Sequence, residues 1–247
     1  MNPQREIVSD EWNSYVADRD GVTTFVSFDE KLAADDLPTE LQQCTRIIVR
    51  ILHPNEVGAP VPPENERLWQ MEDELVASLQ SEEVPCRLIA RMTYKGLREL
   101  VFQHADRDSF RAVIEAWISS QGDYEAEVSE HQGWAYFEDC IRPRHEDTQL
   151  MRDNEQISEL IQHGADPDVE HALQFAFSGS SEKLQLVAES LTERNYHRPD
   201  EPTEGALQMS IRMSLDLQLV TRESLLNRQL AHEAGVKFHG WSVPDAS

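Results

Sequence analysis

The chain is poor in basic residues. It has 22 lysines and arginines against 46 aspartates and glutamates in 247 residues, which gives a net charge of −24. The excess is spread along the sequence, about −15 up to Pro143 and about −9 after it. A polyanion of this size repels phosphates and anionic lipid headgroups and attracts basic protein surfaces. We therefore expect no direct nucleic-acid partner and no membrane partner. The charge serves either solubility alone or the binding of a basic segment of a partner protein.

Cysteine and long apolar runs are also scarce. Cys44, Cys86 and Cys140 are widely spaced and form no Cys-x-x-Cys pair. The first five residues carry no apolar signal core, and no apolar run approaches the length of a bilayer-spanning helix. These absences predict reduced thiols and a cytoplasmic location.

Motifs of known chemistry are missing as well. No two histidines lie three or four residues apart with an acid on the same helical face, which argues against a metal site. Neither a Gly-x-Ser-x-Gly motif nor a glycine-rich phosphate loop occurs. Residues 178–181 lack the lysine and the glycine spacing of a phosphate loop, and we interpret them as a helix N-cap. The sequence predicts no metal, no cofactor and no catalytic residue, so we expect a protein that is not an enzyme.

Patterns of strand and helix are present throughout residues 1–143. Asp20-Gly21 lies between two strand-like runs, and this dipeptide favours a β-hairpin because glycine accepts a positive φ. The patterns that follow are a strand (45–53), a helix after Pro63, a hairpin (86–93 and 97–103), a helix capped by Asp106 and a strand (124–129). The order strand, helix, hairpin, helix, strand predicts a ferredoxin-like sandwich.

The same order recurs in residues 144–247. A helix ends at Gly164 and is followed by a strand (169–177), a helix capped near Ser180 or Ser181, a strand about Tyr196, a strand (206–217), a helix (222–234) and a strand (238–243). We therefore predict the α+β class, with two ferredoxin-like (βαββαβ) α/β sandwich domains over residues 1–143 and 144–247. The first domain is preceded by the β-hairpin.

A sheet of this order can bind single-stranded RNA when aromatic side chains on its central strands form a stacking platform in a basic setting. Here the candidate central strands carry Leu173 and Phe175, and Met209 and Ile211, which do not resemble that motif, and the charge opposes it. Trp241, which follows Gly240 near the end of the last strand, is assigned to core packing.

The C-terminal third resembles a known family. The residues that carry the likeness are a helix over 154–163, Gly164-Ala165-Asp166, Glu170-His171 leading to Phe175, Leu230-Ala231, and the closing Gly235-Val236-Lys237-Phe238-His239-Gly240-Trp241. Over about 90 residues this pattern is similar to the RraB family of regulators of ribonuclease activity. The chain departs from the family where His239 replaces the more common acid, and where the loop after Asp166 is shortened.

Residues 11–143 resemble a bacterial domain family of unknown function, number 695, that is commonly joined to an RraB-like domain. The likeness is carried by Trp12-x-x-Tyr15, Glu72-Asp73-x-Leu75, Gly96-x-Arg98-Glu99-Leu100-x-Phe102, and Trp134-x-x-Phe137 before Pro143.

The RraB resemblance implies an acidic adaptor that binds the scaffold region of ribonuclease E and restrains RNA degradation without chemistry of its own. It also implies Glu170 and His171 as partner-binding residues, because they match the family's acid-histidine pair beside a loop. A structural role for a histidine at a strand end is the alternative. Two other functions stay open. One is an immunity-type or antitoxin-like partner of a basic effector; the other is an enzyme of unknown type with a site between the domains, which would need a pocket with several perturbed titratable groups.

Overall fold

The computed structural model describes residues 7–34, 37–198 and 205–244 of the chain. The chain divides into unit 1 (Met1–Pro143) and unit 2 (Arg144–Ser247). Both units combine helices with an antiparallel sheet, so the predicted α+β class is confirmed. No helix in the described ranges is long and apolar enough to cross a bilayer.

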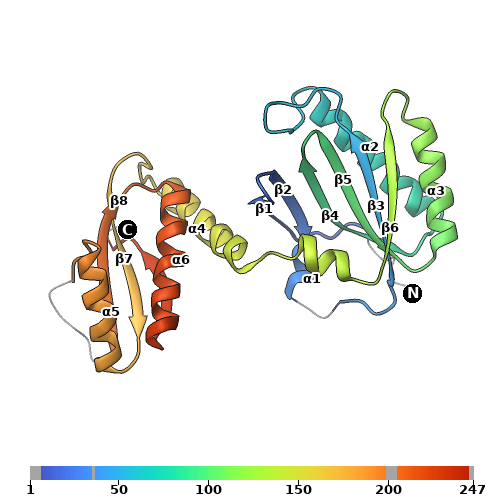
Figure 1. The fold of residues 1–247 in the computed structure, drawn as a ribbon. Helices are drawn as coiled ribbons and strands as arrows, with labels where there is room; N and C mark the ends of the chain where they lie inside the picture. Colours follow the sequence, from blue (N-terminus) through green and yellow to red (C-terminus); the bar gives the residue numbers. More distant parts are fainter. Residues whose placement is uncertain (1–6, 35–36, 199–204, 245–247) are drawn as a thin grey trace. The chain divides into compact units, whose positions relative to one another are not determined.

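Unit 1 contains a six-stranded antiparallel sheet in the order β1-β2-β4-β5-β3-β6 (Figure 1). Its strands are β1 (Trp12–Asp18), β2 (Thr23–Asp29), β3 (Gln43–Arg50), β4 (Cys86–Tyr94), β5 (Leu97–His104) and β6 (Ala126–Gln132). The β1–β2 hairpin turns at Asp20 and Gly21, whose φ angles are 57° and 77°, as the Asp-Gly pair predicts. Strands β6-β3-β5-β4 have the ferredoxin-like order, and the hairpin extends the sheet beside β4.

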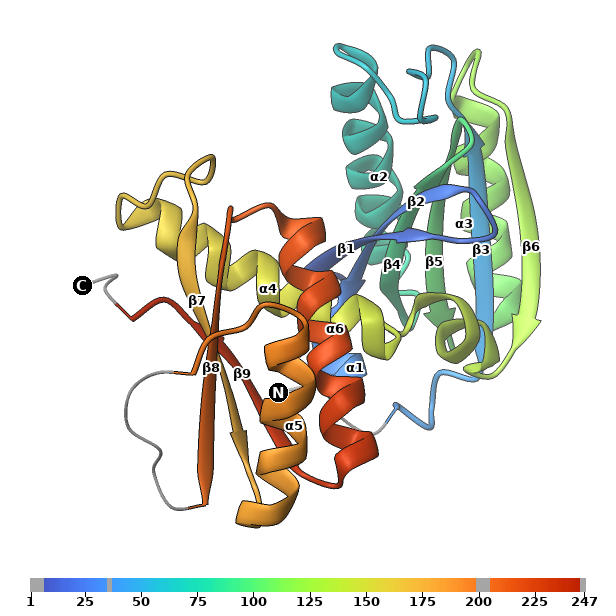
Figure 2. The same cartoon turned by 60° about the vertical axis from the view of Figure 1, so that its left-hand side comes forward.

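Two long helices cover one face of this sheet, α2 (Glu64–Ser81) and α3 (Arg107–Ser120) (Figure 2). Asp106 caps α3 as expected, because its carboxylate accepts the N–H groups of Asp108 and Ser109 at 2.9 and 3.0 Å. The core between helices and sheet includes Leu75, Leu79, Phe102, Phe110 and Trp117.

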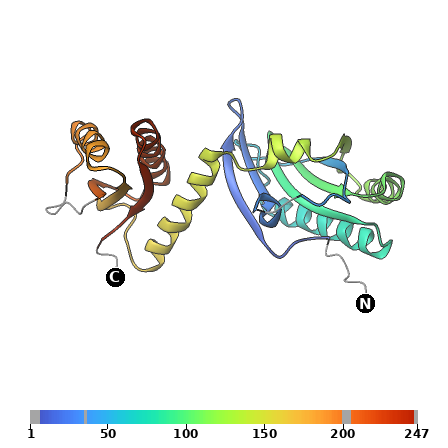
Figure 3. The same cartoon turned by 90° about the horizontal axis from the view of Figure 1, so that it is seen from below.

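The other face of the unit 1 sheet is covered by the segment after β6. This segment contains a short π-helical turn, η1 (Phe137–Ile141), which lies on the opposite side of the sheet from α2 (Figure 3). Phe137 and Ile141 are fully buried there, and the hydroxyl of Tyr15 in β1 donates to the carbonyl oxygen of Ile141 at 2.7 Å. A short helix, α1 (Glu30–Ala34), follows β2. The sheet is therefore packed on both faces.

A β-bulge interrupts β4 between Leu88 and Ala90. Leu88 pairs with Phe102 while Ala90 pairs with Val101, so one residue of β4 has no counterpart in β5. Before the bulge Leu88 packs in the core under the helices, and after it Arg91 points to that same face.

Unit 2 contains a three-stranded antiparallel sheet in the order β8-β7-β9. Its elements are α4 (His145–Gln162), β7 (His171–Ser178), α5 (Ser181–Glu193), β8 (Ala206–Met213), α6 (Leu217–Ala234) and β9 (Lys237–Ser242). Helices α5 and α6 cover one face of the sheet, and α4 packs against α6 (Figure 3). The core between them includes Phe175, Phe177, Leu191, Val220 and Trp241.

Three expected boundaries in unit 2 differ from the structure. The strand expected about Tyr196 is only an isolated antiparallel bridge between His197 and Ser210, and residues 199–204 lie outside the described ranges. The strand expected over 206–217 ends at Met213. Helix α6 begins at Leu217 instead of residue 222, because the carboxylate of Asp216 accepts the N–H of Leu219 at 2.9 Å and starts the helix five residues earlier.

Candidate functional site

The loop that joins α4 to β7, residues 163–170, is here called the acidic loop. Asp166, Asp168 and Glu170 are all exposed in it and it contains no lysine or arginine. The carboxylate of Asp166 accepts the N–H of Asp168 at 3.0 Å, and the N–H of Leu215 donates to the carbonyl oxygen of Pro167 at 3.1 Å. The loop is thus held by one side-chain and one backbone hydrogen bond, while its three acids are exposed to solvent.

The two residues expected to bind a partner lie where this loop enters β7. Glu170 has a side chain that is 66% exposed, and its carboxylate lies 3.6 Å from Nε of Arg212, which is exposed to the same degree. The ring of His171 is half-buried, and its Nε2 lies 2.7 Å from the carbonyl oxygen of Asp166, so this nitrogen donates. Glu170 and His171 are neighbours in the chain, but their side chains make different contacts. Glu170 faces Arg212, whereas His171 faces back to the loop.

The open face of the unit 2 sheet has no aromatic side chain at its centre. Along β7 the outward positions are Ala172, Gln174 and Ala176, whereas Phe175 and Phe177 are buried under the helices. Base stacking on a sheet needs aromatic rings on that outward face. The described strands of unit 2 therefore offer no platform of the kind that binds single-stranded RNA.

A polar cluster is buried between α4, α6 and β9. Oδ1 of Asp153 accepts the indole N–H of Trp241 at 2.8 Å, the amide of Gln149 at 2.9 Å and the hydroxyl of Ser224 at 3.3 Å. Oδ2 of Asp153, also buried, has no hydrogen-bond partner among the described residues. A guanidinium lies nearby on Arg228, but it donates to the Gln149 side chain. Trp241 is thus a core residue whose indole nitrogen is used inside the unit.

Unit 1 has a buried carboxylate of another kind. Glu99 on β5 is fully buried and accepts four hydrogen bonds, two from Arg46 at 2.7 and 2.8 Å and one each from the hydroxyls of Tyr94 and Tyr136 at 2.7 Å. Burial alone would raise the pKa of Glu99, but the bonds from Arg46, Tyr136 and Tyr94 outweigh it and hold the pKa below its ordinary value. Burial and the Glu99 charge raise the pKa of Tyr94 to about 12. Glu99 is therefore a charged acceptor with no lone pair directed to a substrate.

Thiol and metal chemistry find little support in the described part of the chain. Burial raises the pKa of Cys44 and of Cys86 to about 12, so both remain thiols at neutral pH. Within the described ranges, no three histidine, cysteine or acidic side chains lie close enough together to hold a metal ion.

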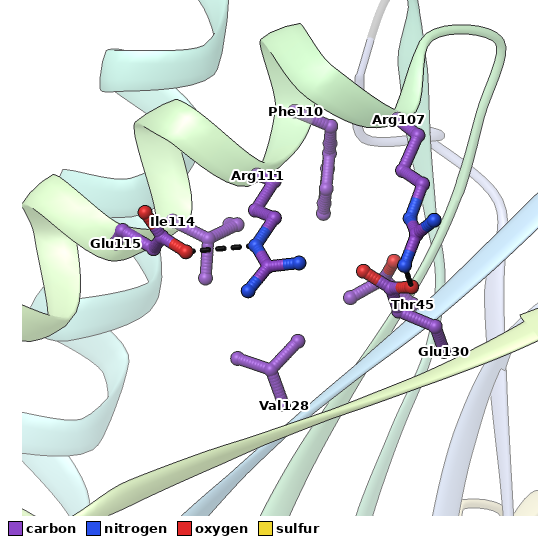
Figure 4. Close-up of a pocket in the computed structure, with 8 residues that line it drawn as sticks. All are labelled: Thr45, Arg107, Phe110, Arg111, Ile114, Glu115, Val128 and Glu130. Carbon is purple, nitrogen blue, oxygen red and sulfur yellow. Dashed lines mark hydrogen bonds and ion pairs between the residues drawn. The ribbon is translucent and has the colours of Figure 1, made fainter.

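A small pocket opens in unit 1 between α3 and β6 (Figure 4). Its volume is about 310 Å³, and Phe110, Ile114 and Val128 provide its apolar surface. Arg107 pairs with Glu130 across the pocket mouth, and Arg111 pairs with Glu115 at 2.7 Å. No local pattern in the sequence indicates this pocket, because its walls come from a helix and a strand that meet only in the folded sheet.

Comparisons with known proteins divide the chain in the same way as its contacts do. Residues 10–141 match the model of a family of unknown function, DUF695, and residues 151–243 match the model of the family "Regulator of ribonuclease activity B", RraB. Both resemblances noted in the sequence are confirmed. The search of curated proteins returned no match.

Among solved structures, a crystal structure of an unknown protein from Galdieria sulphuraria aligns with 82% of this chain and 99% of its own, at 11% identity. Its TM-score of 0.20 is too low for any conclusion about fold or function.

Proposed function

Because the chain belongs to the family of unknown function DUF695, and residues 151–243 match the RraB model, we propose that it is a non-catalytic regulator of a ribonuclease. Unit 2 binds a basic segment of the enzyme, of the ribonuclease E type, and modulates its activity. The observation that carries this proposal is that the RraB match contains the whole acidic loop, where three exposed acids stand without a lysine or arginine among them.

Electrostatics give the proposal its mechanism. Opposite charges on two proteins accelerate their encounter, and exposed ion pairs weaken as salt is added. In the free protein Arg212 partly neutralises Glu170 from 3.6 Å. A lysine or arginine of the partner would replace Arg212 beside that carboxylate, while the Asp166 and Asp168 carboxylates add to the attraction.

The proposal is tested by titrating the protein into the purified scaffold region of a ribonuclease E, by calorimetry at low and high salt. We expect the affinity to fall as the salt concentration rises. The variant Glu170→Ala with His171→Ala should weaken binding, at about 0.2–1 kcal/mol for the exposed charge pair. Binding that does not depend on salt would contradict the electrostatic mechanism.

A matched control separates this surface from net charge in general. Glu182 lies in the first turn of α5, which follows the far end of β7, so it lies at the opposite end of the unit from the acidic loop. Glu182→Ala removes the same charge and should leave the affinity unchanged. If the double variant binds like wild type, Glu170 and His171 do not belong to the binding surface. If no ribonuclease binds at all, the proposed function is wrong.

A further inference from the structure

The outer edge of the unit 1 sheet at β6 carries free backbone groups. β6 is last in the strand order and, among the described strands, pairs with β3 alone. The carbonyl oxygen of Glu125 accepts the N–H of Arg50 at 3.0 Å, and the N–H of Gly133 donates to Gln42 at 2.7 Å, so the odd-numbered residues here direct their backbone groups to β3. The even-numbered residues direct theirs to the free edge. These are Ala126, Val128, Glu130 and Gln132.

The pocket of Figure 4 lies beside this free edge. Val128 and Glu130 belong both to the pocket and to the set with outward backbone groups. Side chains alternate between the two faces of a strand. In a strand added alongside β6, every second side chain would therefore point to the same face as Val128, toward the pocket and α3. A free strand edge next to a side-chain pocket is the arrangement by which proteins bind extended peptides.

The lining of the pocket favours one large aromatic side chain. Its volume of about 310 Å³ is at the lower limit for small-molecule sites, and its apolar surface is formed by Phe110, Ile114 and Val128. In Figure 4 the guanidinium of Arg111 extends from α3 toward Val128. A guanidinium over the face of an aromatic ring is attractive. Since Arg111 already pairs with Glu115, it adds no unbalanced positive charge.

The surroundings of the edge favour a basic peptide. Its three arginines are each paired with a glutamate: Arg50 with Glu125, Arg107 with Glu130, and Arg111 with Glu115. Further exposed acids are Asp108 on α3, Asp123 in the turn between α3 and β6, and Glu127 on β6. Lysines on the face of a bound strand that points away from the pocket would lie near Glu127, and unit 1 as a whole has a charge of about −15.

We infer that unit 1 binds an extended basic segment of a partner protein as a seventh strand on β6, with one aromatic side chain in the pocket between α3 and β6. This interaction stands apart from the proposed regulation of a ribonuclease, because it concerns the other unit and requires only the peptide chemistry described.

The test uses the full chain and a fluorescein-labelled peptide, Lys-Thr-Lys-Trp-Lys-Thr-Lys, measured by fluorescence anisotropy. Its tryptophan and threonines share one face of the strand and its lysines share the other. The variant Val128→Pro removes the central outward N–H, and proline is tolerated on an edge strand. We expect it to weaken binding about tenfold or more, which corresponds to the loss of one backbone hydrogen bond. Val128→Ala keeps the N–H and should weaken binding less than about threefold, through lost apolar contact alone.

Further outcomes decide the remaining parts of the inference. Hydrogen exchange of the Val128 and Glu130 amides should slow when the peptide binds, because both N–H groups become paired. A peptide with alanine in place of tryptophan, and one with glutamate in place of every lysine, should bind more weakly. Any one of four results would overturn the inference. The peptide binds Val128→Pro as tightly as wild type, the amide exchange does not change, the control peptides bind as tightly as the original, or the wild type binds no peptide.

Discussion

The two units bury a carboxylate in different ways. In unit 1 both oxygens of Glu99 are satisfied, and a guanidinium supplies the opposite charge. In unit 2 only one oxygen of Asp153 is bonded, by three neutral donors, and its other oxygen has no partner among the described residues. A buried charge with its partner and bonds in place is costly to break, whereas a partly satisfied polar group contributes less. Equal burial of two carboxylates therefore does not mean equal structural importance.

The largest effect is expected from Trp241→Ala in unit 2. The change removes a buried ring from the core and a donor from Asp153, and such a substitution costs about 3–5 kcal/mol. The loss in the free energy of unfolding is measured by urea denaturation of the fragment 144–247, which we expect to fold on its own. A fragment without a cooperative thermal transition would contradict this boundary. Unchanged stability together with lost ribonuclease binding would show that Trp241 belongs to the binding surface instead.

The next effect is that of Glu99→Gln in unit 1. The amide keeps the shape of the side chain but leaves Arg46, which is only 18% exposed, without its counter-charge. Removing one member of a buried ion pair costs about 3 kcal/mol or more. Urea denaturation of the full chain, followed by circular dichroism, measures this loss. A change below 1 kcal/mol, on the order of an exposed pair, would mean that the four bonds to Glu99 add little to the stability of unit 1.

Acid should destabilise unit 1 through two groups. Burial lowers the pKa of His104 below its ordinary value of 6.5. Burial would raise the pKa of Glu99, but its hydrogen bonds from Arg46, Tyr136 and Tyr94 hold that pKa below the ordinary value of 4.5. In both cases the unfolded chain binds the proton more readily, so stability is present above the unfolded pKa and is lost as the pH falls. We expect the thermal midpoint of unit 1 to fall first below pH 6.5 and again below pH 4.5. In His104→Gln the first decrease should be absent, and its persistence would exclude His104 as its source.

The smallest effect is expected from Asp153→Asn. Oδ1 keeps its three donors, and the change replaces Oδ2, which has no hydrogen-bond partner among the described residues, with an amide nitrogen. The weaker acceptor and the lower cost of burial act in opposite directions, so stability should change by less than about 1 kcal/mol. A loss as large as that of Glu99→Gln, measured in the same way, would remove the contrast between the two units.

The sequence predicted those parts of the fold that depend on neighbouring residues. Asp20-Gly21 specified a hairpin and Asp106 a helix cap, because each signal acts within three residues. The strand at Tyr196 was wrong because that residue is held by the core, against Phe175, while His197 makes only a bridge. The aromatic ring of Tyr196 indicated a buried residue, but a residue in a short loop can be buried as well as one in a strand.

Local sequence signals also locate the candidate sites only in part. Glu170 and His171 were proposed from a local likeness. Glu170 is the last residue of the acidic loop and His171 the first of β7, but their contacts with Arg212 and Asp166 depend on the folded sheet. The pocket at β6 was missed altogether. Its position depends on β6 being the outermost strand, which follows from the order of all six strands and not from any residue in β6 itself.

The bulge in β4 has a consequence for how this protein can change length during evolution. The unmatched residue between Leu88 and Ala90 lets Leu88 and Arg91 face the same layer although they are three positions apart. Deleting one residue there would restore strict alternation and turn either Leu88 away from the apolar core or Arg91 away from Glu72 on α2. Gaps among relatives should therefore fall in the connection before Cys86 and be excluded from the strand, where a single lost codon would exchange its two faces.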